Sequence, residues 1–170
     1  MTNRIEKPPA EANPAPVAPI QKHVSVDRDV ATAFRFFIDN FSDWWPQARH
    51  SVSAMKEDRN AVAVRMEARV GGRIYEVDDH GDEILWGHIQ TLEPGKRIVM
   101  SWHPGSGTEG TTEVEFRFVS TGPDSARVEL EHRNWDRLGD DALGTRDSYE
   151  NGWVYVFEQC FVEEIAKFTQ

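Results

Sequence analysis

The chain has 170 residues and a formal net charge of −10 at pH 7, because 29 acidic residues outnumber 19 lysines and arginines. No basic cluster offsets this charge locally, so we expect neither nucleic acid nor a membrane surface as a partner. The single cysteine, Cys160, rules out an internal disulfide and every zinc site built from several cysteines, which fits a reducing compartment.

The N-terminal segment is set apart by its composition. Residues 1–19 contain five of the nine prolines and few large apolar side chains. Such a stretch buries too little surface to offset the entropy lost on ordering, so we expect a disordered tail. It lacks the apolar segment of a signal peptide, and no window of the chain approaches the ~18 apolar residues of a membrane span. We therefore expect a cytoplasmic protein with one domain over residues 20–170.

The domain begins with a strand and two short helices. Residues 20–26 alternate between apolar and polar side chains, which is typical of a strand. Asp27 or Asp29 can then cap a helix whose apolar residues share one face. A second helical turn is predicted at residues 42–45, where Pro46 stops it.

The middle of the chain has the period of a β-sheet. Short turns rich in glycine separate the apolar runs, which predicts an antiparallel meander. The predicted strands are residues 61–68, 72–78, 83–92, 96–102, 112–120 and 126–134. From Asp147 to Phe168 large apolar residues recur at helical spacing, which predicts a long amphipathic helix.

This order of elements predicts an α+β fold of the helix-grip type. In it a curved antiparallel sheet of about seven strands wraps around the long C-terminal helix, and the two short helices follow the first strand. Several local motifs agree with that fold. They are Trp44-Trp45-Pro46, Gly71-Gly72-Arg73-Ile74-Tyr75-Glu76, Trp86-Gly87-His88-Ile89, Glu93-Pro94 with Arg97-Ile98, Ser101-Trp102, Thr112-Glu113-Val114 with Phe116, Leu130-Glu131-His132-Arg133 and Gly152-Trp153.

With these motifs the chain resembles the START/SRPBCC (birch-pollen-allergen-like) superfamily. Within it, the chain resembles the homologues of the activator of the heat-shock-protein-ninety ATPase. The resemblance covers residues 20–168 and leaves the proline-rich segment outside. It implies an elongated apolar cavity, often used for small hydrophobic ligands, but no one shared reaction, so activity has to be argued from the site.

Alternation along the strands indicates which side chains face the cavity. In the strand of residues 83–92 it places Leu85, Gly87 and Ile89 inside, with Trp86 on the outer face, and the missing side chain of Gly87 could leave room inside. The same pattern is typical of a plain core. The residues predicted to contact a ligand are Trp45, Met100, Trp102, Phe116, Phe118, Leu130, His132, Trp153 and Phe157.

Glu76 is an acidic residue on an otherwise apolar strand face. A buried carboxylate is costly unless it is paired. Arginines are dense around the Gly71-Gly72 turn, so we expect Glu76 to pair with Arg69 or Arg73 and not to bind a metal. The alternative is a cavity carboxylate that orients a ligand or moves a proton.

His132, on the inward face of its strand, raises the same question. A lone inward histidine is more often a core residue satisfied by hydrogen bonds than a base. No serine or cysteine nucleophile stands at a spacing that would complete a triad. Together, however, Glu76 and His132 are candidate catalytic residues, as a general acid/base pair.

Other motifs do not support a cofactor or a metal. Residues 78–82 lack the spacing of a calcium loop, so we expect a solvated turn. Residues 103–108 are rich in glycine but precede a strand and no lysine follows, so they lack the context of a phosphate-binding loop. Cys160 is predicted to be a buried apolar residue.

Three functions remain open. The first is a protein that binds a small apolar or aromatic molecule between sheet and helix. The second is a cyclase or hydrolase that uses Glu76 and His132. The third is a chaperone-associated interaction module. A homodimer is left open in each case.

Overall fold

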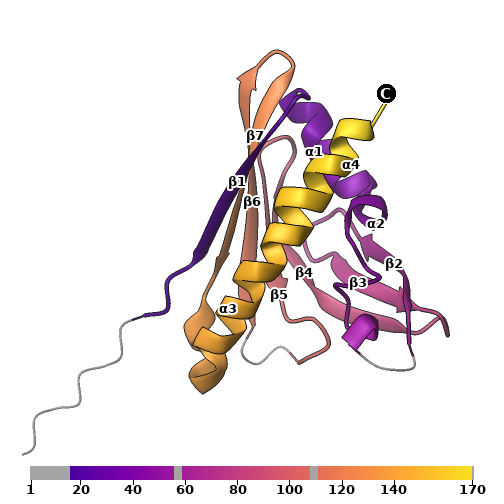
Figure 1. Ribbon diagram of the computed structural model, residues 1–170, viewed down its shortest axis with the longest axis vertical. Helices are drawn as coiled ribbons and strands as arrows, with labels where there is room; N and C mark the ends of the chain where they lie inside the picture. Colours follow the sequence, from indigo (N-terminus) through magenta and orange to yellow (C-terminus); the bar gives the residue numbers. More distant parts are fainter. Residues whose placement is uncertain (1–15, 56–58, 108–110, 170) are drawn as a thin grey trace, which may run out of the picture.

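The computed structural model describes residues 16–55, 59–107 and 111–169 of the chain (Figure 1). Its centre is an antiparallel sheet in the order β1-β7-β6-β5-β4-β3-β2. Six strands follow one another as a meander, and β1 pairs with β7 along its whole length, from Ile20 opposite His132 to Val26 opposite Ala126. The strands are β1 Ile20–Val26, β2 Ala61–Met66, β3 Arg73–Asp78, β4 Glu83–Glu93, β5 Arg97–Trp102, β6 Thr112–Gly122 and β7 Ser125–Arg133.

Two short helices cover one end of the sheet. Helix α1 spans Val30–Asp39, and its N-terminus is capped by Asp29, whose carboxylate accepts from the Thr32 amide at 3.0 Å. Helix α2 spans Phe41–Trp44. After Pro46 the chain forms the 3₁₀ turn η1, Ser53–Met55, before it enters β2. The predicted order of elements is confirmed.

The closing helix lies across the concave face of the sheet (Figure 1). It is built from four segments, namely η2 Trp135–Asp141, α3 Ala142–Trp153, a π-helical segment η3 Val154–Phe161 and α4 Val162–Lys167. Its regular part begins five residues before the predicted start. The first turns carry mostly polar and small residues, so they lack the apolar spacing that signals a buried face.

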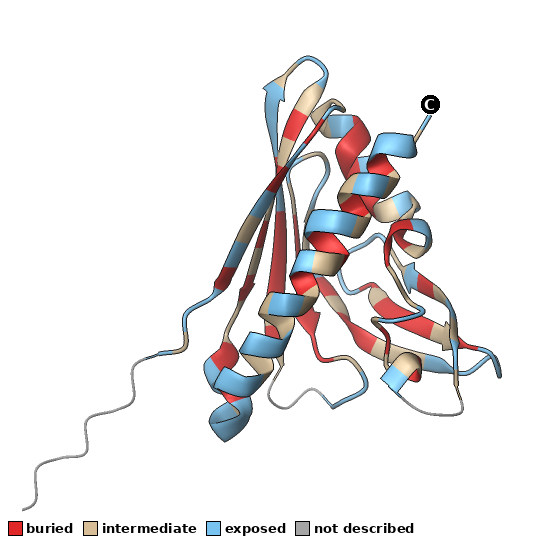
Figure 2. Cartoon of the chain, viewed as in Figure 1, coloured by how far each residue is buried: buried red, intermediate tan, exposed pale blue. Residues whose placement is uncertain are grey.

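The core lies between the helix and the sheet, where the facing sides of both are buried (Figure 2). Aromatic rings make up much of it: Phe157 is fully buried, and its ring centroid lies 5.6 Å from that of Phe116. At the edge of the sheet, Lys22 of β1 reaches Glu150 and Glu158 of the helix at 3.4 and 3.2 Å. The fold is the predicted helix-grip arrangement.

The predicted disordered tail, residues 1–19, falls largely outside the described residues. The last part of it is described and contacts the domain. The Val17 amide donates to Asp136, and the Arg146 guanidinium donates to the carbonyl oxygens of Ala18 and Pro19 at 2.6 and 3.2 Å. Residues 17–19, which the sequence assigns to the tail, therefore contact the domain.

Candidate functional site

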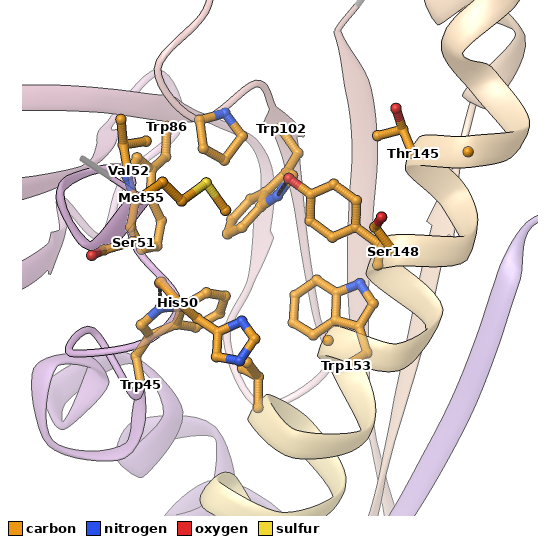
Figure 3. Close-up of a pocket in the computed structure, with 15 residues that line it drawn as sticks. Trp45, His50, Ser51, Val52, Met55, Trp86, Trp102, Thr145, Ser148 and Trp153 are labelled. Carbon is orange, nitrogen blue, oxygen red and sulfur yellow. Dashed lines mark hydrogen bonds between the residues drawn. The ribbon is translucent and has the colours of Figure 1, made fainter. Parts of the chain in front are cut away.

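A cavity of about 470 Å³ opens between the sheet and the closing helix, on the side away from α1. Three parts of the chain enclose it: the loop that follows α2, the adjoining ends of β4 and β5, and helix α3 (Figure 3). The residues that line it are Trp45, His50, Ser51, Val52, Met55, Trp86, Trp102, Pro104, Gly144, Thr145, Ser148, Tyr149, Gly152, Trp153 and Val156.

Four tryptophans, which we call the tryptophan wall, line the cavity: Trp45, Trp86, Trp102 and Trp153. The ring centroid of Trp45 lies 5.1 Å from that of Trp86 and 5.7 Å from that of Trp102. It lies 5.8 Å from the ring of Trp153, which stands edge-on. These spacings are typical of tilted and T-shaped aromatic pairs, so the indoles hold one another in place. Their exposed fractions, between 1% for Trp86 and 7% for Trp45, show that the four indoles are largely buried.

Trp86 reaches this wall through a β-bulge, and its predicted position was wrong. Opposite Ile74 stands Gly87, but opposite Tyr75 stands Leu85, so Trp86 is an extra residue in β4. The extra residue reverses the alternation. Trp86 therefore faces the interior, whereas Leu85, predicted inside, lies on the outer face with Tyr75.

Gly87 permits the close contact of β4 with β5. A Cβ atom at this position would lie 1.8 Å from the carbonyl oxygen of Ser101. The space that was predicted to be free for a ligand is therefore filled by the neighbouring strand. The bulge is further fixed because the His88 amide donates to the Ser101 hydroxyl at 2.9 Å.

Glu76 is fully buried, and the prediction that it pairs with an arginine was wrong. Its carboxylate accepts from the amides of Val52 and Ser53 at 2.8 and 2.7 Å, and also from the Ser53 hydroxyl. The indole Nε1 of Trp86 donates to it as well, at 2.7 Å. Backbone dipoles thus take the place of a cation.

The arginines near Glu76 are engaged elsewhere. The guanidinium of Arg73 contacts Glu67 and Glu83, and that of Arg69 contacts Glu67. These pairs lie at the edge of the sheet, so the arginine density that suggested an ion pair belongs to the surface. Through its hydrogen bonds, the carboxylate of Glu76 instead positions one side of the cavity, namely the loop at Val52 and the indole of Trp86.

His132 is buried within a complete set of hydrogen bonds. Trp153 Nε1 donates to its Nδ1 at 3.1 Å, and because an indole N–H can only donate, Nδ1 is the acceptor. Nε2 then carries the proton and donates to the Thr112 hydroxyl at 2.7 Å, which donates in turn to the carbonyl of Trp102. Burial lowers the pKa of His132 to about 3, so the ring is neutral at physiological pH.

The structure divides the predicted ligand-contact residues into two groups. Trp45, Trp102 and Trp153 line the cavity. The other six lie behind that wall in the core: Met100, Phe116, Phe118, Leu130, His132 and Phe157. A direct role of these six in binding stays a prediction.

The polar residues of the cavity lining were not found from the sequence; they are His50, Ser51, Thr145, Ser148 and Tyr149. His50 lies in the loop after α2, which has no periodic pattern, and its ring packs on that of Tyr155 at 5.4 Å. Burial, and then the charge of Arg49, lower the pKa of His50. Tyr149 lies on α3, one turn before Trp153, and its hydroxyl accepts from Trp102 Nε1 at 3.2 Å.

The remaining motifs have structural roles. Asp78 organises the turn of residues 78–82: it accepts from the amides of His80 and Asp82, both at 2.9 Å, and from Arg59 at 2.8 Å. Cys160 is half-buried instead of buried, and burial raises the pKa of its thiol. Over the described ranges, no three histidine, cysteine or acidic side chains are grouped so that they could hold a metal ion. No helix of those ranges is long and apolar enough to cross a membrane.

A curled seven-stranded sheet that grips a long C-terminal helix, with a cavity between them, defines a protein of the START/SRPBCC helix-grip class. The sequence pattern of one family in that class, described as activator of Hsp90 ATPase homolog 1-like protein, matches residues 29–162. The chain belongs to this family. Among curated proteins none matches the chain.

Several solved structures share the fold. The chain is 30% identical to the anthrahydroquino-gamma-pyrone synthase Txn09, solved as a complex with SUM, with a TM-score of 0.58 over 87% of this chain and 97% of that one. It is 26% identical to CalC, a self-sacrificing resistance protein from Micromonospora echinospora, with a TM-score of 0.65 over 88% and 94% of the two chains. An HSP90 activator from Plasmodium falciparum is 18% identical, with a TM-score of 0.61 over 89% and 97%, and shares the fold.

Proposed function

We propose that this protein binds a small apolar aromatic molecule in the cavity between the sheet and the closing helix. The observation that carries the proposal is the tryptophan wall, in which four indoles that contact one another border a cavity of about 470 Å³. Ligand pockets in proteins usually measure about 300–1,000 Å³ and are lined mainly by apolar and aromatic groups.

The wall is suited to an aromatic ligand for two reasons. Indole rings form stacked or edge-to-face pairs with other aromatic rings, and such pairs are more stable than the burial of the same area against aliphatic side chains. The indoles are also fixed before a ligand arrives, because Glu76 holds Trp86 and His132 holds Trp153. A preformed wall lowers the entropy lost on binding.

The comparisons support a small-molecule role. Two similar proteins, at 30% and 26% identity, are named as a synthase of an anthrahydroquino-gamma-pyrone and as a resistance protein. The synthase name denotes an aromatic compound, in agreement with an aromatic wall. The HSP90 activator is similar at the level of the fold alone, so a chaperone-associated role draws no further support from it.

An enzyme that uses Glu76 and His132 is less well supported. Neither residue lines the cavity, and their polar atoms are engaged by Val52, Ser53 and Trp86 or by Thr112 and Trp153. A general acid or base has to reach the proton that it transfers. We therefore propose binding and not catalysis as the function.

We also propose a cytoplasmic location, as the sequence predicts.

The test measures the dissociation constant of fluorene, a planar apolar probe, by equilibrium dialysis and by the change in tryptophan emission. Ser148→Trp adds bulk at a residue that lines the cavity on α3, and Leu143→Trp adds the same bulk on that helix outside the lining. We expect saturable binding of one fluorene per chain, at least tenfold weaker in Ser148→Trp and unchanged in Leu143→Trp. Absence of saturable binding, or equal losses in both variants, would contradict the proposal.

A further inference from the structure

The hydroxyl of Tyr149 is a hydrogen-bond donor in the cavity lining whose proton is not used. Its oxygen accepts from Trp102 Nε1 at 3.2 Å. Within the described ranges the structure provides no acceptor for its own proton. Burial raises the pKa of Tyr149 and the Trp102 bond opposes that rise, so the group stays protonated at physiological pH.

The orientation of this donor is fixed from two sides. The Tyr149 ring packs on His132 at 4.8 Å and on Trp135 at 5.6 Å, and both of these residues are fully buried. The Trp102 indole occupies one lone pair of the hydroxyl oxygen. The O–H bond must then avoid the indole N–H, because two donors cannot point at each other.

Other hydroxyl groups of the lining differ from Tyr149. The Ser51 hydroxyl, which accepts from the Ala54 amide at 3.0 Å, points away from the centre of the cavity (Figure 3). Ser148 is exposed at the rim, where water satisfies it without cost, and the Thr145 hydroxyl points away from the tryptophan wall (Figure 3). Tyr149 is therefore the hydroxyl that a ligand can satisfy at the inner part of the lining, beside Trp102 and Trp153.

We infer that the cavity selects aromatic carbonyl compounds, with the Tyr149 hydroxyl donating to the carbonyl oxygen while the ring lies against the tryptophan wall. A carbonyl oxygen suits this position because it accepts a proton and brings no second donor that would be left unpaired. This inference rests on the proposed function and names the ligand class for the same site.

The experiment compares two probes and two variants. Fluorenone and fluorene have the same ring system and differ by a carbonyl in place of a methylene group. Tyr149→Phe removes the hydroxyl in the cavity, and Tyr75→Phe removes a tyrosine hydroxyl on the outer face of β3, away from the cavity. Dissociation constants of both probes are measured by equilibrium dialysis for the wild type and for each variant.

We expect Tyr149→Phe to weaken fluorenone binding roughly two- to tenfold more than it weakens fluorene binding, because one neutral hydrogen bond is lost only for the carbonyl probe. Tyr75→Phe should change neither. If both probes bind and Tyr149→Phe changes both equally or neither, the inference is wrong while the proposed function stands. If neither probe binds the wild type, the proposed function itself fails.

A spectroscopic measurement on the wild type avoids any effect of the substitution on folding. A hydrogen bond to a carbonyl lowers its stretching frequency. The infrared band of bound fluorenone should therefore lie below the band of fluorenone in an apolar solvent. A band at the position found in the apolar solvent would overturn the inference.

Discussion

The indole nitrogen of Trp86 donates to the buried carboxylate of Glu76 at 2.7 Å, and this bond connects the cavity wall to the sheet behind it. The same carboxylate accepts from the amides of Val52 and Ser53 in the loop across the cavity. One side chain that no ligand touches thus positions two sides of the site. We regard Glu76 as a positioning residue, and this role can be measured.

We expect Glu76→Gln to lower the free energy of unfolding by roughly 1–3 kcal/mol, because the amide NH₂ replaces an acceptor and leaves a buried donor unpaired. The measurement is urea unfolding. Glu83→Gln is the control, since Glu83 is half-exposed and its ion pair with Arg73 should contribute at most about 1 kcal/mol. The variant should also weaken fluorene binding. Equal unfolding midpoints for Glu76→Gln and the wild type would contradict the positioning role.

Because of His132, the free energy of unfolding should depend on pH even at pH values above those at which the carboxylates titrate. The unfolded chain takes up a proton on this ring near pH 6.5, whereas the folded protein resists protonation down to about pH 3. Stability is therefore lost as the pH falls below 6.5, by up to about 1.4 kcal/mol per pH unit.

This dependence is tested by urea unfolding between pH 6.5 and 5. His132→Gln should flatten the slope, while His23→Gln, at an exposed position of β1, should keep the wild-type slope. A slope in His132→Gln as steep as that of the wild type would show that the histidine is not kept neutral by the fold.

Gly87→Ala should prevent the β4 bulge from forming, because the added Cβ would meet the Ser101 carbonyl oxygen at 1.8 Å. Two atoms at this distance overlap and must move apart. We therefore expect the free energy of unfolding to fall by more than about 4 kcal/mol, or no folded protein at all. Gly144→Ala is the matched control on α3, where a Cβ meets nothing within 4 Å and alanine favours the helix by roughly 1 kcal/mol. Thermal unfolding followed by circular dichroism distinguishes them, and similar melting temperatures would refute the close contact.

Substitutions at Phe157 and Met55 should distinguish the contribution of the core to stability from the contribution of the cavity to binding. Phe157 is fully buried behind the wall, so Phe157→Ala should lower the free energy of unfolding by roughly 3–5 kcal/mol. Met55 is 82% exposed at the cavity rim, so Met55→Ala should change stability by less than about 0.5 kcal/mol while altering fluorene binding. Urea unfolding and dialysis give both quantities. A stable Phe157→Ala variant would mean that the helix does not close the sheet.

The sequence predicts the fold well because its signals are local. Period-two alternation places the strands within a few residues of their observed bounds, as for the strand Ile20–Val26. The aromatic spacing that includes Phe157 predicts the closing helix. The first turns of this helix were not predicted, because their residues are polar or small and lack apolar spacing. No sequence pattern indicates the π-helical segment that begins at Val154.

The site was harder to predict because it depends on contacts between distant residues. One extra residue in β4 turns Trp86 inward, and alternation alone does not reveal an insertion. The partners of Glu76 are amides of a loop 23 and 24 residues earlier, and backbone donors leave no trace in the sequence. His50 enters the cavity from a loop without an apolar period. Tyr149 lies inside the predicted helix, four residues before Trp153, but its contact with Trp102 follows only from the three-dimensional structure.

The most direct test of the account is a crystal structure of the protein with fluorenone. The account predicts one fluorenone in the cavity, with its ring against the tryptophan wall of Trp45, Trp86, Trp102 and Trp153 and its oxygen within hydrogen-bonding distance of the Tyr149 hydroxyl. A structure in which these side chains fill the cavity, or in which fluorenone lies only on the outer surface, would contradict it.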